Sequence, residues 1–238
     1  MRRAKRLSIL HEDDEILVID KPAGLLTIPS DPARAAFEDT VLRRVREYIA
    51  RPRGPRPYVG VLHRLDRDTS GALALALTRA AHAAGREMFA SHQFERHYLA
   101  LVHGVPHPPA GTIRAPISSR YTSGRRGVAR PGEEARDAVT HYTVLESMGR
   151  TALVALELET GRQHQIRAHL EHLGYPLVGE RVYSGGAGPK IVARRQMLHA
   201  WKLSFRHPLR STPIAVEADP PRDFLETLAR QGSKVHKV

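Results

Sequence analysis

The stretch HRLDRDTSG, residues 63–71, brings together the ionisable side chains best suited to do chemistry in this chain. Two aspartates, two arginines and a histidine stand between two apolar runs, YVGV (58–61) and ALALAL (72–77). Charged groups at the end of a buried strand cost free energy unless they are paired or used. The stretch is therefore either a turn whose side chains bind nearby backbone groups, or a reaction centre.

Asp66 is the candidate nucleophile of this stretch. Leu65 is the apolar residue between Arg64 and Asp66, so we expect Leu65 to point inward and its two neighbours to point elsewhere. Burial raises the pKa of an aspartate, whereas a cation about 4–6 Å away lowers it by about 1–3 units. A nucleophilic Asp66 therefore needs a guanidinium partner. Asp68 is expected to be an exposed turn residue or an N-cap-like acceptor, and not a second catalytic acid.

The apolar periodicity predicts an α+β protein with a mixed, largely antiparallel central β-sheet flanked by helices, because several strands follow one another without an intervening helix. No long linker divides the chain, so we expect a single domain over 1–238. The predicted strands are 15–20, 58–63, 72–77, 97–102, 138–147, 151–159, 200–205 and 213–218. The predicted helices are 38–50, 79–90, 162–174 and 222–231.

Two basic segments interrupt these elements. The segment 51–57, RPRGPRP, is expected to be an irregular surface loop because of its prolines and glycine, and 120–136 is expected to be a mobile hairpin or loop. The inward face of the helix before the first segment is predicted at Val41, Leu42, Val45, Tyr48 and Ile49.

The composition points to a soluble protein with a polyanionic partner. The formal net charge of +12 favours nucleic acid, and the absence of cysteine excludes disulfides, thiolate zinc sites and iron–sulfur clusters. No stretch approaches the roughly 20 apolar residues of a membrane helix, and the amino-terminal residues contain no signal-peptide core. We therefore expect a cytoplasmic protein that does not bind membranes.

HRLDRDTSG also resembles the signature of the RluA-type pseudouridine synthases, which isomerise selected uridines in structured RNA. Further stretches resemble other motifs of this family, in the expected order along nearly the whole chain. They are LVIDKPAGLLTIP (17–29), RHYLALVHG (96–104), LETGRQHQIRAHLEHLGYPLVGERVY (158–183) and LHAWKLSFRHP (198–208). The resemblance implies the pseudouridine synthase fold, a ribosomal or transfer RNA substrate, and no cofactor or metal.

The resemblance also implies residue roles. Asp66 matches the nucleophile that attacks the target uridine, after which the N1–C1′ bond breaks, the uracil rotates and C5 bonds to C1′. Arg167 matches its ion-pair partner, Tyr98 the tyrosine that packs on the target base, and Arg64 the arginine that fills the space left by the turned-out uridine. The other residues expected to bind substrate are His63, Thr69, Arg162, His164 and Gln165.

Several features depart from the family pattern. Arg96 stands where a lysine is common, and Gly179-Glu180 replaces a Gly-Asp pair, which leaves the role of Glu180 open. The chain begins close to the first motif, so we expect no S4-type RNA-binding domain before it and a monomeric protein.

Two other functions compete with the isomerase. A non-catalytic RNA-binding or ribosome-assembly factor could retain the fold, and a metal-dependent hydrolase could use His164, His169 and His172. Neither alternative would give Asp66, Tyr98 and Arg167 a joint role, and no HExxH pattern supports a metal site.

Overall fold

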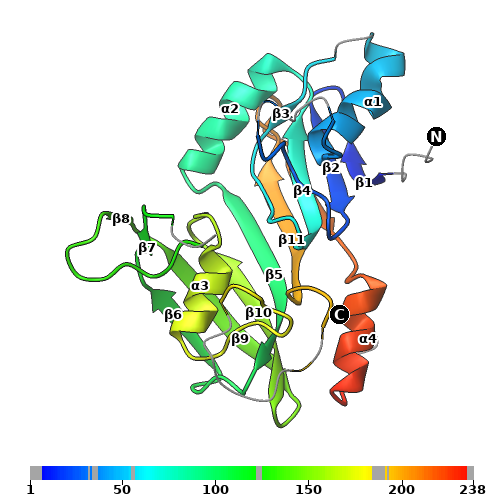
Figure 1. Cartoon of the computed structure of the whole chain (residues 1–238). Coiled ribbons are helices and arrows are strands. Elements are labelled where there is room, and N and C mark those ends of the chain that lie inside the picture. The colour runs from blue at the N-terminus through cyan, green and yellow to red at the C-terminus, as the bar shows by residue number, and fades with distance from the viewer. Residues whose placement is uncertain are drawn as a thin grey trace. The chain divides into compact units, whose positions relative to one another are not determined.

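A computed structural model describes residues 7–31, 33, 37–54, 57–121, 125–183, 191 and 193–234 (Figure 1). The chain divides into two compact units, each described here by itself. Unit 1 comprises Met1–Glu95 and Ala200–Ala218, and unit 2 comprises Arg96–His199 and Asp219–Val238. The expectation of a single domain stays a prediction.

The sheet of unit 1 is built from consecutive antiparallel ladders. Its strands are β1 (Ser8–Glu12), β2 (Ile16–Lys21), β3 (Gly60–Val61), β4 (Ser70–Ala76), the part of β11 (Leu198–Arg206) that begins at Ala200, and β12 (Pro213–Glu217). The order is β1-β2-β4-β11, with β3 paired to β4 and β12 paired to β11. The ladders β1–β2, β2–β4, β3–β4 and β11–β12 are antiparallel, as expected for the fold class.

Strands β2 and β4 are buried on both faces, which explains their continuous apolar sequences. Ile16 and Val18 pack with Ala72, Ala74 and Ala76 and with helix α2 (Arg79–Ala90). Helix α2 has the bounds that the periodicity predicts, and the Thr78 side chain caps it by accepting the Ala81 N–H.

Helix α1 (Val41–Arg53) corrects two sequence-based expectations. Tyr48 is 46% exposed rather than inward, because its hydroxyl donates to Glu12 Oε2 at the surface. The helix also includes residues 51–53, which were expected to belong to a loop. The proline at position 52 lacks one main-chain N–H donor, but this loss falls in the last turn and does not interrupt the rest of the helix, which ends at Gly54 with a φ of 88° that other residues rarely adopt. Residues 55 and 56 lie outside the described part of the chain.

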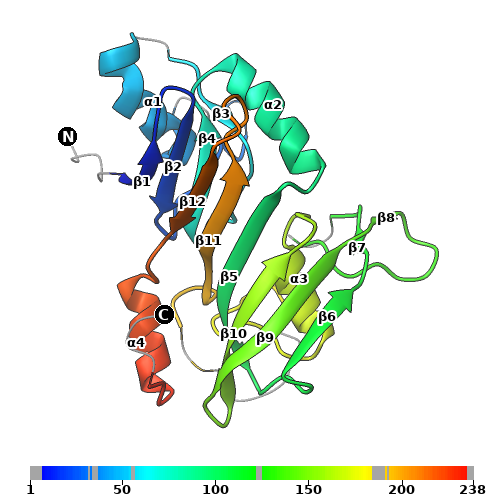
Figure 2. The ribbon, with the colours of Figure 1, turned by 180° about the vertical axis from the view of Figure 1, so that it is seen from behind.

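Unit 2 contains a second antiparallel arrangement. The strands β5 (Phe94–His103, from Arg96), β10 (Thr151–Leu158), β9 (Val139–Ser147) and β6 (Ala110–Arg114) pair in that order. Helix α3 (Gln165–His172) covers one face of β6, β9 and β10, in front of them in Figure 1 and behind them in Figure 2. It is shorter than the predicted helix 162–174, but Gly174 follows it at φ 88° as a stop. Helix α4 (Arg222–Arg230) matches the predicted helix 222–231 to within one residue.

The basic segment 120–136 closes a hairpin. Strand β7 (Ile117–Ser118) pairs antiparallel with β8 (Ala135–Arg136), and residues 122–124 lie outside the described part. None of the helices in the described residues is long and apolar enough to cross a membrane.

Candidate active site

The loop that carries Asp66 is fixed to the segment after β2 on both sides of the aspartate. The Thr27 hydroxyl donates to the Leu65 carbonyl at 2.9 Å and accepts the Leu65 N–H at 3.4 Å. On the other side, the Arg67 carbonyl accepts the Gly24 N–H at 2.9 Å, and Arg67 Nε donates to the Gly24 carbonyl at 3.2 Å. The two family-like stretches 17–29 and 63–71 therefore form one hydrogen-bonded assembly in unit 1.

Lys21 lies under this assembly. Its side chain is fully buried, and its Nζ donates to the carbonyls of Pro22, Leu25 and Arg67 at 3.1, 2.9 and 3.0 Å. Several acceptors around one ammonium group are what a buried lysine requires. A lysine after an apolar strand would ordinarily be expected at the surface, so sequence reasoning missed this role.

Asp66 itself is half-buried, and Arg64 is exposed and Leu65 is buried, as the sequence predicts. Asp68 is half-buried and not exposed as expected. The Asp66 carbonyl accepts the Thr69 N–H at 3.1 Å, which closes a turn. After this turn, Gly71 has a φ of 113°, and a Cβ atom there would lie 2.1 Å from the Ala200 carbonyl oxygen. The turn and the glycine set the direction in which the loop enters β4.

His63 supports the loop from the other end. Its Nε2 accepts the Ala74 N–H at 3.1 Å, and its ring stacks on Phe89 with 5.1 Å between centroids. Because Nε2 uses its lone pair on the backbone, the neutral ring carries its proton on Nδ1. This position makes His63 part of the support of the loop.

Arg167 lies in unit 2 and is held by Glu180. Arg167 Nε and Nη2 each donate to one Glu180 carboxylate oxygen at 2.8 Å, and the two side chains are only 8% and 2% exposed. Burial alone would raise the pKa of Glu180, but the hydrogen bonds and charge of Arg167 and the N–H groups of Val182 and Arg181 lower it below its ordinary value. Glu180 is therefore ionised at neutral pH.

Tyr183 packs against the same arginine and fixes His164. The Tyr183 ring is fully buried, with the Arg167 Cζ 4.8 Å from its centroid. Its hydroxyl donates to the Arg126 carbonyl at 2.8 Å, so His164 Nδ1, also at 2.8 Å, must donate to the hydroxyl oxygen. The neutral His164 ring then carries its lone pair on Nε2. His164 also has a φ of 58°, an uncommon conformation that is often found at functional sites.

Tyr98 and Arg96 are neighbouring inward residues of β5. Tyr98 is 6% exposed and Arg96 is 5% exposed. Burial lowers the pKa of Arg96, although the group stays cationic. The Arg96 guanidinium donates to the carbonyls of Leu158 and Glu159 at 3.2 and 3.3 Å, and it occupies the space that a side chain at Gly161 would need. Arg96 therefore ties β5 to the end of β10.

Gln165 belongs to the interior of unit 2. Its Oε1 accepts from the Thr160 hydroxyl and the Arg162 N–H, and its Nε2 donates to the Val139 carbonyl and the Thr140 hydroxyl. These bonds use the full capacity of the amide. A substrate could bind this amide only by breaking one of them.

The predicted histidine group, His164, His169 and His172, is tested by the contacts of His169. His169 is fully buried, with Nδ1 at 2.9 Å from the Thr140 hydroxyl and Nε2 at 2.8 Å from the Ala115 carbonyl. Both ring nitrogens are thus engaged within the protein, and burial lowers the pKa of His169. His169 is therefore a core residue and not a ligand.

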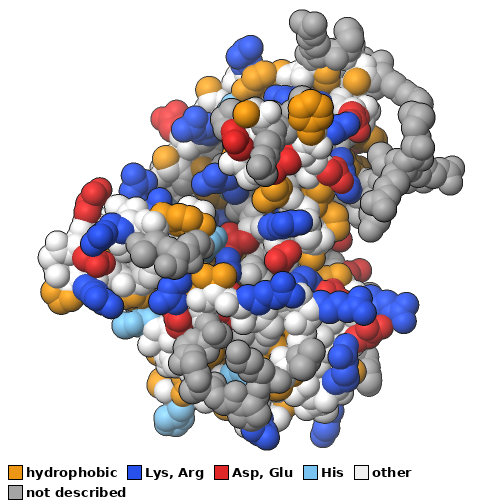
Figure 3. All heavy atoms as spheres, in the orientation of Figure 1, with side chains coloured by type: hydrophobic (Ala, Val, Ile, Leu, Met, Phe, Trp, Pro, Cys, Tyr) orange, Lys and Arg blue, Asp and Glu red, His pale blue; other side chains and the backbone are white. Residues whose placement is uncertain are grey.

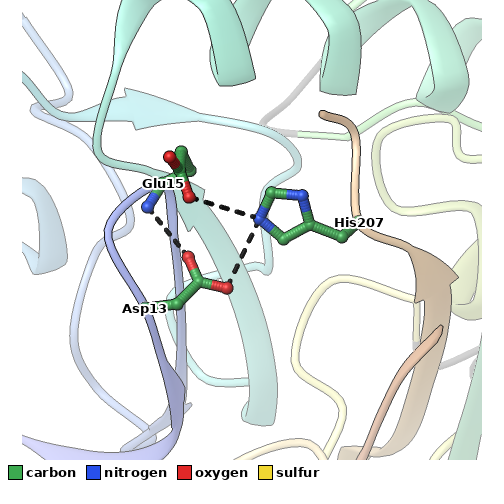
Figure 4. Close-up of side chains that lie close together, drawn as sticks. All are labelled: Asp13, Glu15 and His207. Carbon is green, nitrogen blue, oxygen red and sulfur yellow. Dashed lines mark hydrogen bonds and ion pairs between the residues drawn. The ribbon is translucent and has the colours of Figure 1, made fainter. Parts of the chain in front are cut away.

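Asp13, Glu15 and His207 also lie close enough together to hold a cation (Figure 4). However, His207 Nδ1 accepts the N–H groups of Leu209 and Arg210 at 3.2 and 3.1 Å, so the ring proton is on Nε2, which faces the two carboxylates. A metal needs a lone pair there, and the Arg210 guanidinium already pairs with Glu15. The donor set does not fit a metal, and the cluster instead joins the β1–β2 turn to the β11–β12 turn.

The predicted site residues divide between the units. Arg64, Asp66 and Thr69 lie in unit 1, whereas Tyr98, Arg162, His164 and Arg167 lie in unit 2. The approach of Asp66 to Arg167 therefore stays a prediction. The structure adds Lys21, Thr27 and Tyr183, which no sequence pattern singled out, and it supplies contacts for Glu180, whose role was left open.

Residues 15–172 match the family model described as RNA pseudouridylate synthase. The chain is 40% identical over 230 residues to a ribosomal large subunit pseudouridine synthase D of Xanthomonas campestris, covering 92% of this chain and 67% of the relative. It is 39% identical over 238 residues to a protein of the same name from Pseudomonas aeruginosa, covering 94% and 71%. The solved structure of human RNA pseudouridylate synthase domain containing 4 aligns with a TM-score of 0.77 at 27% identity, over 96% of this chain and 94% of that chain.

Proposed function

The chain belongs to the RNA pseudouridylate synthase family, and from this membership we propose that it converts selected uridines of large-subunit ribosomal RNA to pseudouridine. The names of the bacterial relatives support this RNA over transfer RNA. The net charge of +12 suits a polyanionic substrate, and Lys and Arg side chains spread over much of the face in Figure 3. We further propose that the protein acts as a monomer in the cytoplasm.

Asp66 is the proposed nucleophile. Its carboxylate attacks the target uridine, the N1–C1′ bond breaks, and the uracil turns so that a C5–C1′ bond forms while the bond to the Asp66 carboxylate breaks and frees the enzyme. The C5 proton is lost and N1 gains a proton, so substrate and product are isomers. The reaction therefore consumes no oxidant, reductant or group donor.

The observation that carries this proposal is the anchoring of the Asp66 loop. The main-chain groups of Leu65 and Arg67, the residues on either side of Asp66, are held by hydrogen bonds to the Lys21 and Thr27 side chains and to the Gly24 N–H. A carboxylate on a fixed loop loses little freedom when it meets a substrate carbon, and such positioning is a large part of catalysis. A loop that only closed a turn would not need anchors on both sides of one aspartate.

The remaining roles follow from the chemistry of each side chain. Arg167 is the proposed cation that keeps Asp66 ionised, Tyr98 packs on the target base, and the exposed Arg64 fills the gap left by the extruded nucleotide. We propose that His164 accepts a hydrogen bond through Nε2, from a ribose hydroxyl or the uracil N3–H. Thr69 and Arg162 are proposed to border the substrate, whereas His63 and Gln165 act as supports.

Tritium release from RNA labelled at uridine C5 tests the function directly. We expect release from an unmodified large-subunit ribosomal RNA transcript and not from transfer RNA. Asp66→Asn should abolish release and leave RNA affinity unchanged, whereas Asp68→Asn, in the same turn, should remain active. Full turnover by Asp66→Asn would refute the nucleophile, and RNA binding by the wild type without release would favour the non-catalytic RNA-binding alternative.

A further inference from the structure

We propose that Glu180 is a positioning residue of the reaction, which fixes the guanidinium of Arg167 and compensates its charge. This inference rests on the proposed function, because it concerns the arginine proposed to act on Asp66. The sequence leaves the role of Glu180 open, and the contacts of its carboxylate supply one.

The contact between the two side chains is a side-on bidentate pair. Nε donates to one carboxylate oxygen and Nη2 to the other, both at 2.8 Å. This geometry fixes the plane of the guanidinium as well as its position. The pair is almost fully buried, so water cannot replace either partner at low cost.

The carboxylate is itself immobilised by its own segment. Glu180 Oε1 accepts the N–H groups of Arg181 and Val182, both at 2.9 Å. The preceding residue, Gly179, has a φ of 78°, and a Cβ atom there would lie 1.9 Å from the Arg195 carbonyl oxygen. This close backbone contact fixes the segment that carries Glu180. The position of the Glu180 carboxylate therefore sets the position of the Arg167 side chain.

Tyr183 holds the face of the guanidinium while Glu180 holds its edge. The Tyr183 hydroxyl is bonded to the N–H and the carbonyl of Arg126, so the ring cannot easily move away. The segment 180–183 thus contacts Arg167 from two directions. Arg167 is set in place before any substrate arrives.

The charges around Arg167 show what Glu180 does electrostatically. In the described part of unit 2, Glu180 and Tyr183 contact Arg167, with His164 at the Tyr183 hydroxyl and Arg125 beside the Tyr183 ring. Arg125 is paired with Glu171. Glu180 therefore compensates Arg167, and it occupies the Nε hydrogen and one Nη2 hydrogen. The attraction between Arg167 and the Asp66 carboxylate is therefore weaker than it would be without Glu180. Asp66 also cannot form a bidentate pair through the edge of the guanidinium that Glu180 occupies, so its oxygen lone pairs stay available for attack.

Glu180→Gln tests the proposal, because it keeps the size of the side chain and removes the charge. The measurement is the single-turnover rate constant at saturating ribosomal RNA transcript, from about pH 5 to about pH 9. We expect the maximal rate to fall roughly ten- to hundredfold because Arg167 loses its anchor. We expect the acidic side of the pH–rate profile, its acid limb, to move down by about one pH unit. Without the charge of Glu180, Arg167 favours the ionised form of the Asp66 carboxylate more strongly.

Asp223→Asn is the matched control. Arg195 in the same unit is also buried and bidentate, with Nε and Nη2 at 2.7 and 3.0 Å from the Asp223 carboxylate. This variant should lower the melting temperature without moving the rate or the acid limb. If Glu180→Gln behaves in the same way, Glu180 is merely structural and the proposal is wrong.

Glu180→Asp keeps the charge but shortens the side chain, and it serves if Glu180→Gln does not fold. Its acid limb should match the wild type while its maximal rate falls, because the carboxylate no longer reaches both guanidinium nitrogens. A wild-type rate in Glu180→Asp would overturn the positioning role. A wild-type enzyme that releases no tritium would overturn the proposed function and this inference together, whereas an active wild type with unaffected Glu180 variants overturns the inference alone.

Discussion

Lys21 Nζ donates a hydrogen bond of 3.0 Å to the main-chain carbonyl of Arg67, which lies 46 residues further along the chain. The bond connects the end of β2 to the residue after Asp66. The same ammonium group binds two carbonyls of the segment that follows β2. A single buried cation thereby organises both halves of the loop assembly around the proposed nucleophile.

Replacement of Lys21 by methionine should weaken both stability and catalysis. The three carbonyls lose a charged donor inside the protein, and each buried group left without a partner costs about 1–3 kcal/mol. We expect the free energy of unfolding in urea to fall by roughly 2–4 kcal/mol, and the rate at saturating RNA to fall in the folded fraction. Lys202→Met, at a half-exposed lysine of the same unit, should change stability by less than about 1 kcal/mol. Equal effects of the two substitutions would contradict the role of Lys21.

Gly71→Ala and Gly24→Ala form a matched pair in unit 1. Both glycines have a positive φ, of 113° and 82°, but only Gly71 faces a backbone atom that a Cβ would overlap. Gly24→Ala should cost about 1–2 kcal/mol of backbone strain. Gly71→Ala should cost more than about 4 kcal/mol or prevent folding, since the Ala200 carbonyl must move. Thermal unfolding followed by circular dichroism measures both, and similar melting temperatures would refute the close approach.

Asp13 should contribute to stability in a defined range of pH. Burial alone would raise its pKa, but hydrogen bonds from the Glu15 N–H, His11 and the Ile16 N–H lower it from 3.8 to about 2. A carboxyl group whose folded pKa is depressed stabilises the protein above its unfolded pKa, and this contribution is lost as the pH falls through the folded pKa. The shift corresponds to about 2 kcal/mol at neutral pH.

Urea unfolding of wild type and Asp13→Asn checks this contribution. The variant should be less stable by about 2 kcal/mol at neutral pH, and the difference should shrink between about pH 4 and about pH 2. A difference that stays constant over this range would show that the charge of Asp13 is not the cause.

The affinity for RNA should fall steeply as salt is added. Each phosphate neutralised on single-stranded RNA contributes roughly −0.7 to the slope of log K against log salt concentration. Fluorescence anisotropy with labelled ribosomal RNA fragments at several potassium chloride concentrations measures the slope. A complex whose affinity does not depend on salt would contradict recognition by the basic surface.

Local patterns in the sequence predicted most of the elements and the candidate nucleophile. Continuous apolar runs predict β2 and β4, and alternating or 3.6-residue apolar patterns predict β9, β10 and α2, because each pattern depends on neighbours close in sequence. The burial of Leu65 beside a half-buried Asp66 follows from the same alternation. The end of α1 was missed because proline and glycine lower helix propensity but do not prevent a last turn.

Tertiary structure alone decided how the proposed site is supported. Lys21 with Arg67, Thr27 with Leu65 and Arg167 with Glu180 join residues 46, 38 and 13 positions apart. Each of these side chains could have been solvated at the surface, and no periodicity distinguishes that outcome from burial. Which carbonyl meets an ammonium group, or which carboxylate meets a guanidinium, depends on where distant segments pack. Local sequence patterns therefore pointed to the candidate carboxylate, whereas the packing of distant segments selected the partners that hold its loop.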